Sequence, residues 1–159
     1  MLAKLNRFML DLPIIWFVLL IVLGSFLLVI PLDLLLPAIK QHPIKEDPAI
    51  IQILIGVFAA PVYETVIFQV FLFWVLSCIP LIKDRDYLII LIASIIFGLS
   101  HSEGITYIVA TAIIGVLYNY AYWLYQKKNE KVEVTISAFW IVFLIHSLHN
   151  SIVVIANVF

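Results

Sequence analysis

The chain has 159 residues, of which 65% are hydrophobic and 12% are charged, and its formal net charge is −1. Soluble domains are about 45–50% apolar and about 25% charged, so this composition excludes an ordinary soluble domain and predicts a multi-pass membrane protein. The near-neutral charge offers nothing that would recruit nucleic acid, and the lone Cys78 excludes an internal disulfide.

Five apolar segments predict five membrane helices. A short lead at 1–12, which we expect along the membrane surface, precedes the first segment. The five segments cover residues 13–30, 48–82, 87–102, 105–126 and 134–159. A spanning helix needs about 20 mainly apolar residues, so we predict one all-α integral-membrane domain over 1–159, a bundle of about five spans.

The second segment is too long for one straight span. As a helix, the stretch from Pro48 to Ile82 would reach about 52 Å, against a hydrocarbon core of about 30 Å. Pro61 lacks an amide hydrogen, and its ring clashes with the carbonyl four residues earlier. We therefore expect this helix to bend, or to end and restart, near Ala60.

Basic residues concentrate on one side of this topology. With five spans, the N-terminus and the loops at 83–86 and 127–133 share a side. That side holds seven of the nine Lys and Arg residues: Lys4, Arg7, Lys83, Arg85, Lys127, Lys128 and Lys131. The other side holds Lys40 and Lys45. Because basic loops stay cytoplasmic, we expect a cell-membrane protein with a cytoplasmic N-terminus and an outer C-terminus.

Glu64 is the only charged residue between Pro48 and Ile82. A carboxylate at the centre of a membrane helix costs about 2.5–3.5 kcal/mol on insertion-based scales, and such residues normally face a protein interior or a wet cavity. Glu64 is therefore a functional-site hypothesis in its own right.

Other polar residues are expected at the same depth as Glu64. His101 ends the third segment, and His146 and Asn150 are four residues apart on one face of the fifth. The alternating directions of the helices bring these residues toward the same side of the membrane as Glu64. We interpret Asn119, in the fourth segment, as a residue that hydrogen-bonds to a neighbouring helix.

These side chains suit hydrolysis of a carbonyl compound. A carboxylate and a histidine can activate a shared water, with the carboxylate taking its proton. A second histidine and an asparagine amide can donate to the oxyanion that forms. Alternatively, Glu64, His101 and His146 could bind zinc, because two histidines and a glutamate form a catalytic zinc set. No HExxH motif is present.

Three short motifs occur in order on successive predicted spans. They read Ala60-Pro61-Val62-Tyr63-Glu64-Thr65-Val66-Ile67-Phe68-Gln69, Phe97-Gly98-Leu99-Ser100-His101 and His146-Ser147-Leu148-His149-Asn150. Over about residues 60–155 this combination resembles the CPBP family of CAAX-protease and bacteriocin-processing enzymes, also called the ABI family. The motifs of that family are Glu-Glu-x-x-x-Arg, Phe-x-x-x-His and His-x-x-x-Asn.

The resemblance implies a glutamate-dependent intramembrane endopeptidase that acts in membrane lipid on a peptide or lipidated protein, although many members of the family are labelled metalloproteases. We expect no cofactor, with zinc as the alternative. Glu64 and His101 would activate water, and His146 and Asn150 would stabilise the oxyanion. The residues expected to support them are Thr65, Gln69, Phe97 and His149, with Phe97 packed beneath the imidazole of His101.

The first motif departs from the family pattern. Thr65 replaces the second glutamate and Gln69 replaces the arginine, so an ion pair becomes a neutral pair that could hydrogen-bond internally or to a neighbouring helix. This exchange is compatible with a working site. It is also compatible with a catalytically inactive family member that acts as a membrane immunity or partner-binding protein.

Overall fold

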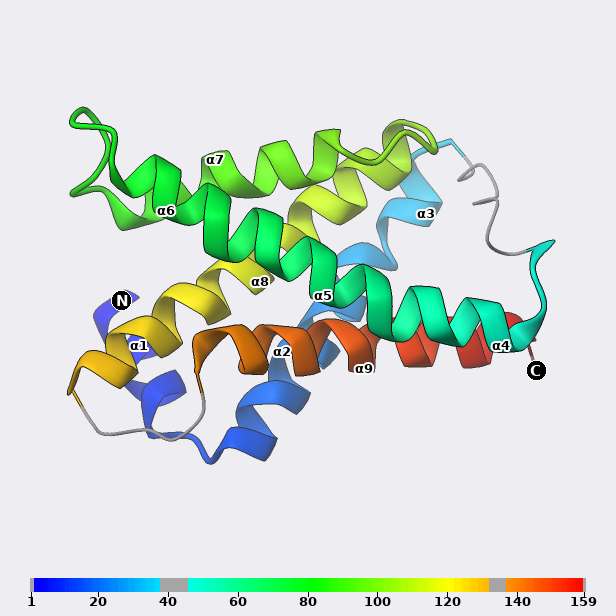
Figure 1. Cartoon of the computed structure of the whole chain (residues 1–159), viewed down its shortest axis with the longest axis horizontal. Helices are drawn as coiled ribbons and strands as arrows, with labels where there is room; N and C mark the ends of the chain where they lie inside the picture. Colours follow the sequence, from blue (N-terminus) through cyan, green and yellow to red (C-terminus); the bar gives the residue numbers. More distant parts are fainter. Residues whose placement is uncertain (1, 38–45, 132–136, 159) are drawn as a thin grey trace.

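The computed structural model describes residues 2–37, 46–131 and 137–158, and every regular element in these ranges is helical (Figure 1). The helices outside the second apolar segment are α1 (Leu2–Asp11), α2 (Ile14–Val29), α3 (Leu32–Leu35), α7 (Asp86–Leu99), α8 (Ile105–Lys131) and α9 (Ala138–Val158). Lys40 and Lys45, on which part of the orientation prediction rests, lie outside the described residues.

Within the described ranges, three helices are long and apolar enough to cross a membrane: Ala49–Ser77, Ile105–Glu130 and Ala138–Asn157. Two shorter apolar helices, Ile14–Val29 and Asp86–Leu99, complete the set. Each of the five falls within or overlaps one of the predicted apolar segments. The all-α membrane bundle is therefore confirmed.

The second apolar segment forms one unbroken helix with two π-helical stretches. Its parts are α4 (Ala49–Gln52), η2 (Ile53–Ala59), α5 (Ala60–Glu64), η3 (Thr65–Phe71) and α6 (Leu72–Ser77). The helix does not end and restart near Ala60. Instead, the disturbance at Pro61 takes the form of wider turns, in which the Ala60 N–H bonds to the carbonyl of Ile55 rather than one residue later. π turns of this kind are frequent at functional sites.

Close contact between small residues fixes α7 against the central helix α8. A Cβ added at Gly98 would lie 2.6 Å from both the Ala112 Cβ and the Ile108 carbonyl oxygen. Such close approach is typical of membrane helices, where small residues replace the hydrophobic driving force of soluble proteins. A buried hydrogen bond of 3.1 Å from Asn119 to Ser94 joins the same two helices, as the sequence predicts for Asn119.

Helix α1 is hydrogen-bonded to α7 and α8 at one end of the bundle. The Asn6 side chain donates to the Tyr87 hydroxyl at the start of α7 and accepts from the Tyr120 hydroxyl of α8. Lys128, near the end of α8, donates to the Leu10 carbonyl. The C-terminus and α4 lie at the opposite end (Figure 1). The segments that carry the described basic residues thus meet at one end.

Candidate functional site

Glu64 and His146 meet in the interior of the bundle, one from the long second helix and one from α9. The His146 Nε2 and Glu64 Oε2 atoms are 3.7 Å apart. The side chain of His146 is 6% exposed and that of Glu64 is 20% exposed. This distance exceeds a normal hydrogen bond, so the carboxylate remains free to bind another donor. Glu64 therefore faces a histidine and an opening, rather than lipid alone.

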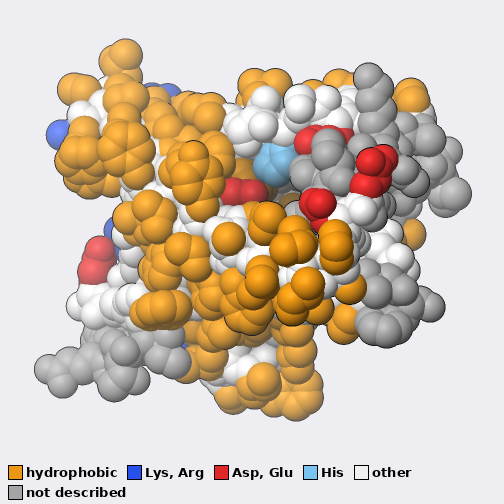
Figure 2. All heavy atoms as spheres, turned by 45° about the vertical axis from the view of Figure 1, so that its right-hand side comes forward, with side chains coloured by type: hydrophobic (Ala, Val, Ile, Leu, Met, Phe, Trp, Pro, Cys, Tyr) orange, Lys and Arg blue, Asp and Glu red, His pale blue; other side chains and the backbone are white. Residues whose placement is uncertain are grey.

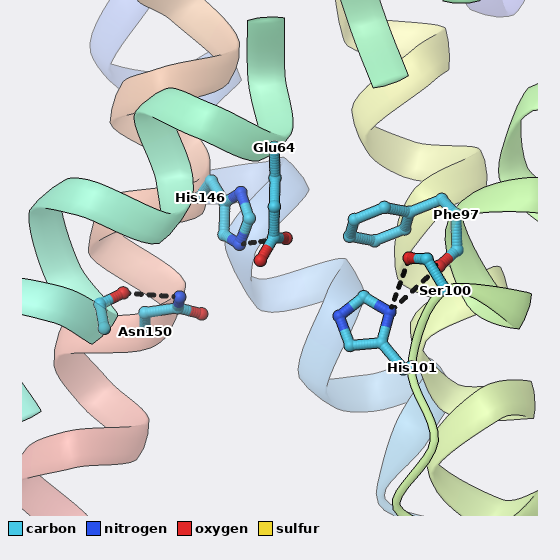
Figure 3. A network of polar contacts seen from close by, with 7 residues as sticks. Glu64, Phe97, Ser100, His101, His146 and Asn150 are labelled. Atoms are coloured by element: carbon cyan, nitrogen blue, oxygen red, sulfur yellow. Dashed lines mark hydrogen bonds and ion pairs between the residues drawn. The ribbon is translucent and has the colours of Figure 1, made fainter. Parts of the chain in front are cut away.

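His101 is held in one tautomer by the end of α7. Its Nδ1 lies 2.9 Å from the Phe97 carbonyl oxygen, which can only accept a hydrogen bond, so Nδ1 carries the hydrogen. The Ser100 hydroxyl donates to the same carbonyl. In the neutral ring, Nε2 then has a free lone pair. Figure 3 shows this nitrogen directed into the gap between His101 and Glu64.

Aromatic rings pack against both histidines, His101 and His146. Phe97 packs edge-on against the His101 ring, with centroids 4.9 Å apart, so its predicted place beneath that imidazole is confirmed. Phe97 also lies 6.4 Å from the His146 ring and 5.0 Å from Phe68. Tyr118 of α8, which is fully buried, lies 4.8 Å from His146. These rings restrict the rotamers of both histidines.

Asn150 is bound to the backbone of the second helix. Its Nδ2 donates to the Gly56 carbonyl oxygen at 2.7 Å. In an α-helix the N–H of Ala60 would occupy that oxygen, but this N–H bonds to Ile55 instead. The next candidate is residue 61, and Pro61 has no N–H to give. The proline of the first motif thus leaves a carbonyl free, and the asparagine of the third motif fills it.

Among the described residues, Thr65 and Gln69 hydrogen-bond neither to each other nor to a neighbouring helix. Both side chains are fully buried, and in the described part of the chain neither the Thr65 hydroxyl nor the Gln69 amide has a hydrogen-bond partner. The expectation of a hydrogen-bonded neutral pair is therefore wrong. Among the described residues these buried polar atoms are unpaired, and such atoms are costly to keep.

His149 contacts two residues of α2. Its Nδ1 lies 2.7 Å from the Ser25 hydroxyl, and its ring stacks on Phe26 with centroids 4.4 Å apart. Sequence reasoning identified His149 as a supporting residue but missed Ser25 and Phe26. The only available signal was Ser25 itself, a hydroxyl in an otherwise apolar helix.

The described residues do not assemble a zinc site. Among them, no group of three His, Cys, Asp or Glu side chains is close enough to hold a metal ion. Within the same ranges, Glu64 and His146 form an ion-pair contact, whereas His101 is not within that distance of Glu64. The alternative zinc set of Glu64, His101 and His146 stays a prediction.

The polar groups reach one face of the molecule. Figure 2 shows histidine and acidic atoms together in a hollow, with hydrophobic side chains to the left and below and acidic and other polar atoms above. An opening of this kind would let both water and a membrane-embedded chain approach the carboxylate. The geometry suits general-base hydrolysis at the edge of the bundle.

Comparison with known families agrees with the motifs. The model of the family described as type II CAAX prenyl endopeptidase Rce1-like matches residues 46–152. This range contains Glu64, His101, His146 and Asn150 and leaves out α1 and α2. No curated protein and no solved structure matches the chain.

The bond between Asn150 and Gly56 predicts a coupling between two motifs. Asn150→Leu leaves the Gly56 carbonyl unpaired and is expected to lower the free energy of unfolding by about 1–2 kcal/mol. In a Pro61→Ala background the new N–H at position 61 can take this carbonyl, so the same change should cost less than half as much. The free energy of unfolding in denaturing detergent is measured for the wild type, for each single variant and for the double variant. If Asn150→Leu lowers the free energy of unfolding equally in both backgrounds, the role assigned to the bond between Asn150 and the Gly56 carbonyl is contradicted.

Proposed function

We propose that this chain, which belongs to the Rce1-like family of type II CAAX prenyl endopeptidases, is an intramembrane endopeptidase that hydrolyses a peptide bond with water activated by Glu64 and His101. The observation that carries the proposal is the arrangement of Glu64, His146 and His101 (Figure 3). There, a partly exposed carboxylate faces the His146 Nε2 at 3.7 Å and the free nitrogen of His101.

Glu64 is the proposed general base. A water in the gap donates one hydrogen to the Glu64 carboxylate and the other to the His101 Nε2 lone pair, which directs an oxygen lone pair at the substrate carbonyl. As the oxygen attacks, its proton passes to Glu64. The same carboxyl group then gives this proton to the amine that leaves when the peptide bond breaks.

His146 and Asn150 are the proposed oxyanion donors. One N–H of the Asn150 amide is used by Gly56, and an amide has a second one to offer. His146 contributes Nε2 when that atom carries a hydrogen. Removal of one oxyanion donor typically costs about 10²–10³ in kcat. The bond to Gly56 supports this role because it fixes the amide before substrate arrives.

The family and the surroundings of the hollow support a substrate class. Hydrophobic side chains border the hollow to the left and below, so a peptide or lipidated protein anchored in the membrane lipid is the proposed substrate. A prenylated C-a-a-X peptide is the first one to test, and bacteriocin processing is the other activity that the motifs suggest.

One feature favours a second candidate, an inactive family member that serves as a membrane immunity or partner-binding protein. Thr65 and Gln69 stand where the family pattern has a glutamate and an arginine, and both are buried without hydrogen bonds in the described part of the chain. Activity of the purified protein distinguishes the two candidates.

Glu64→Gln is expected to lower peptide cleavage by about 10²–10⁴, because the amide cannot accept the proton of water. The assay follows cleavage of a farnesylated C-a-a-X peptide, and of the same peptide without lipid, by purified protein in lipid bilayers. Glu130→Gln, at the basic end of the bundle, is the matched control and should cleave like wild type. Unchanged cleavage by stably inserted Glu64→Gln would remove Glu64 as the base, and an inert wild type would favour the second candidate.

Chelation is expected to leave this cleavage unchanged. The proposed reaction uses a carboxylate and imidazoles alone, and no three-ligand group occurs among the described residues. The measurement is the rate before and after exhaustive dialysis against EDTA and phenanthroline. Loss of activity that added zinc restores would overturn metal-independent hydrolysis.

We also propose that the basic end of the bundle faces the cytoplasm, in line with the distribution of Lys and Arg. Cys78, the lone cysteine, is exposed at this end, just after α6. A membrane-impermeant thiol reagent should therefore label Cys78 in inverted vesicles but not in intact cells. Asn157→Cys in a Cys78→Ser background should give the reverse pattern. Labelling of Cys78 from outside would reverse the topology.

A further inference from the structure

The first hydrophobic helix makes a specific contact with the helix that carries His146 and Asn150. In α2, Ser25 is fully buried, and its hydroxyl donates to the Val22 carbonyl at 2.7 Å. The same oxygen lies 2.7 Å from His149 Nδ1. A hydroxyl has one hydrogen, which Val22 already receives, so His149 Nδ1 must be the donor. Ser25 thereby selects the tautomer of His149.

Phe26 constrains the same ring from its face. The two rings are nearly parallel, with an interplanar angle of 10° and centroids 4.4 Å apart. The hydrogen bond fixes one edge of the imidazole and the stack fixes its plane, so together they hold the His149 side chain in a single orientation. Two adjacent residues of α2 thus contact the same residue of α9.

This contact is well placed to set the rotation of α9. His149 lies directly before Asn150 and three residues after His146. Atoms on the outer surface of a helix lie about 5–6 Å from its axis, so a rotation of about 10° moves them by about 1 Å. A misplacement of about 1 Å can cost on the order of 10²-fold in rate. A small turn of α9 would therefore matter at the site.

Few other residues of α2 can make a contact that fixes the rotation of α9. Apart from the exposed Trp16, Ser25 is the only residue in α2 whose side chain carries a hydrogen-bonding group. Apolar side chains gain little in lipid by facing a helix rather than the lipid, so polar contacts choose among helix rotations. Helix α2 also lies outside residues 46–152, which match the family model, so the contact is an addition to the family motifs.

We propose that Ser25 and Phe26 form a latch on His149 that, together with the bond from Asn150 to Gly56, sets the rotation of α9, which makes the first hydrophobic helix a positioning element of the site. The inference rests on the proposed function only for its consequence in catalysis. Its structural part stands independently of it, because the rotation of α9 can be measured without a substrate.

A disulfide can report that rotation. A Cβ at Gly56 would lie 3.8 Å from Val154 Cγ2, on α9 one turn beyond Asn150, which suits a bridge after slight adjustment. Gly56→Cys with Val154→Cys in a Cys78→Ser background should therefore form a disulfide under mild oxidation. Added Ser25→Ala should slow its formation several-fold, and Ser25→Thr, which keeps the hydroxyl, should restore it. Equal rates in all three would overturn the latch.

The catalytic consequence is tested in the protein without added cysteines. Ser25→Ala is expected to lower kcat by about tenfold or more with little change in KM, and Ser25→Thr should recover most of it. Phe26→Leu, which removes the stack and keeps the hydrogen bond, should lower kcat less. A fall in folded protein with unchanged kcat would mean a purely structural contact and overturn the proposal. If wild type cleaves no peptide, the disulfide rates alone decide, so failure of the latch and of the peptidase remain distinguishable.

Discussion

In an apolar bundle surrounded by lipid, the hydrophobic effect does little to decide which face of a helix meets its neighbour. Close contacts and hydrogen bonds must make that choice. Here, Gly98 lets α7 approach α8, Asn150 bonds to the backbone of the second helix, and Ser25 bonds to His149 of α9. Each contact fixes the rotation of a helix that contributes to the gap around Glu64. The site depends on these few interactions more than on the large apolar surface around them.

Pro61 links the irregular backbone to the chemistry. A proline inside a membrane helix frees a carbonyl that lipid cannot solvate, so another part of the protein must supply a donor. The π turns shift the freed oxygen to Gly56, and Asn150 supplies the amide. The polar side chain is thereby held in place by a defect in a neighbouring helix. Proline and asparagine, separated widely in the sequence, form one structural unit.

Composition and proline chemistry were sufficient to predict the apolar helices and the disturbance at Pro61, and the alternating directions of the helices predicted the approach of Glu64 to a histidine. They could not predict the form of that disturbance, since a break and a π turn both relieve the same clash. Tyr118 and Ser25 were missed because an apolar sequence does not reveal which face of a membrane helix turns inward. The hydrogen bond expected of Thr65 and Gln69 failed because helical spacing shows that two residues share a face, and the distance between their polar atoms depends on rotamers.

The exchange of an acid and a base for Thr65 and Gln69 leaves the net charge near Glu64 the same, because the two lost charges are opposite. What changes is the supply of fixed donors and acceptors. An arginine would offer the carboxylate a permanent cation, whereas here the described contact of Glu64 is a histidine at 3.7 Å, which is a cation only when it is protonated. The neighbour of the carboxylate is therefore positioned by α9, so the rotation of α9 decides how His146 lies against Glu64.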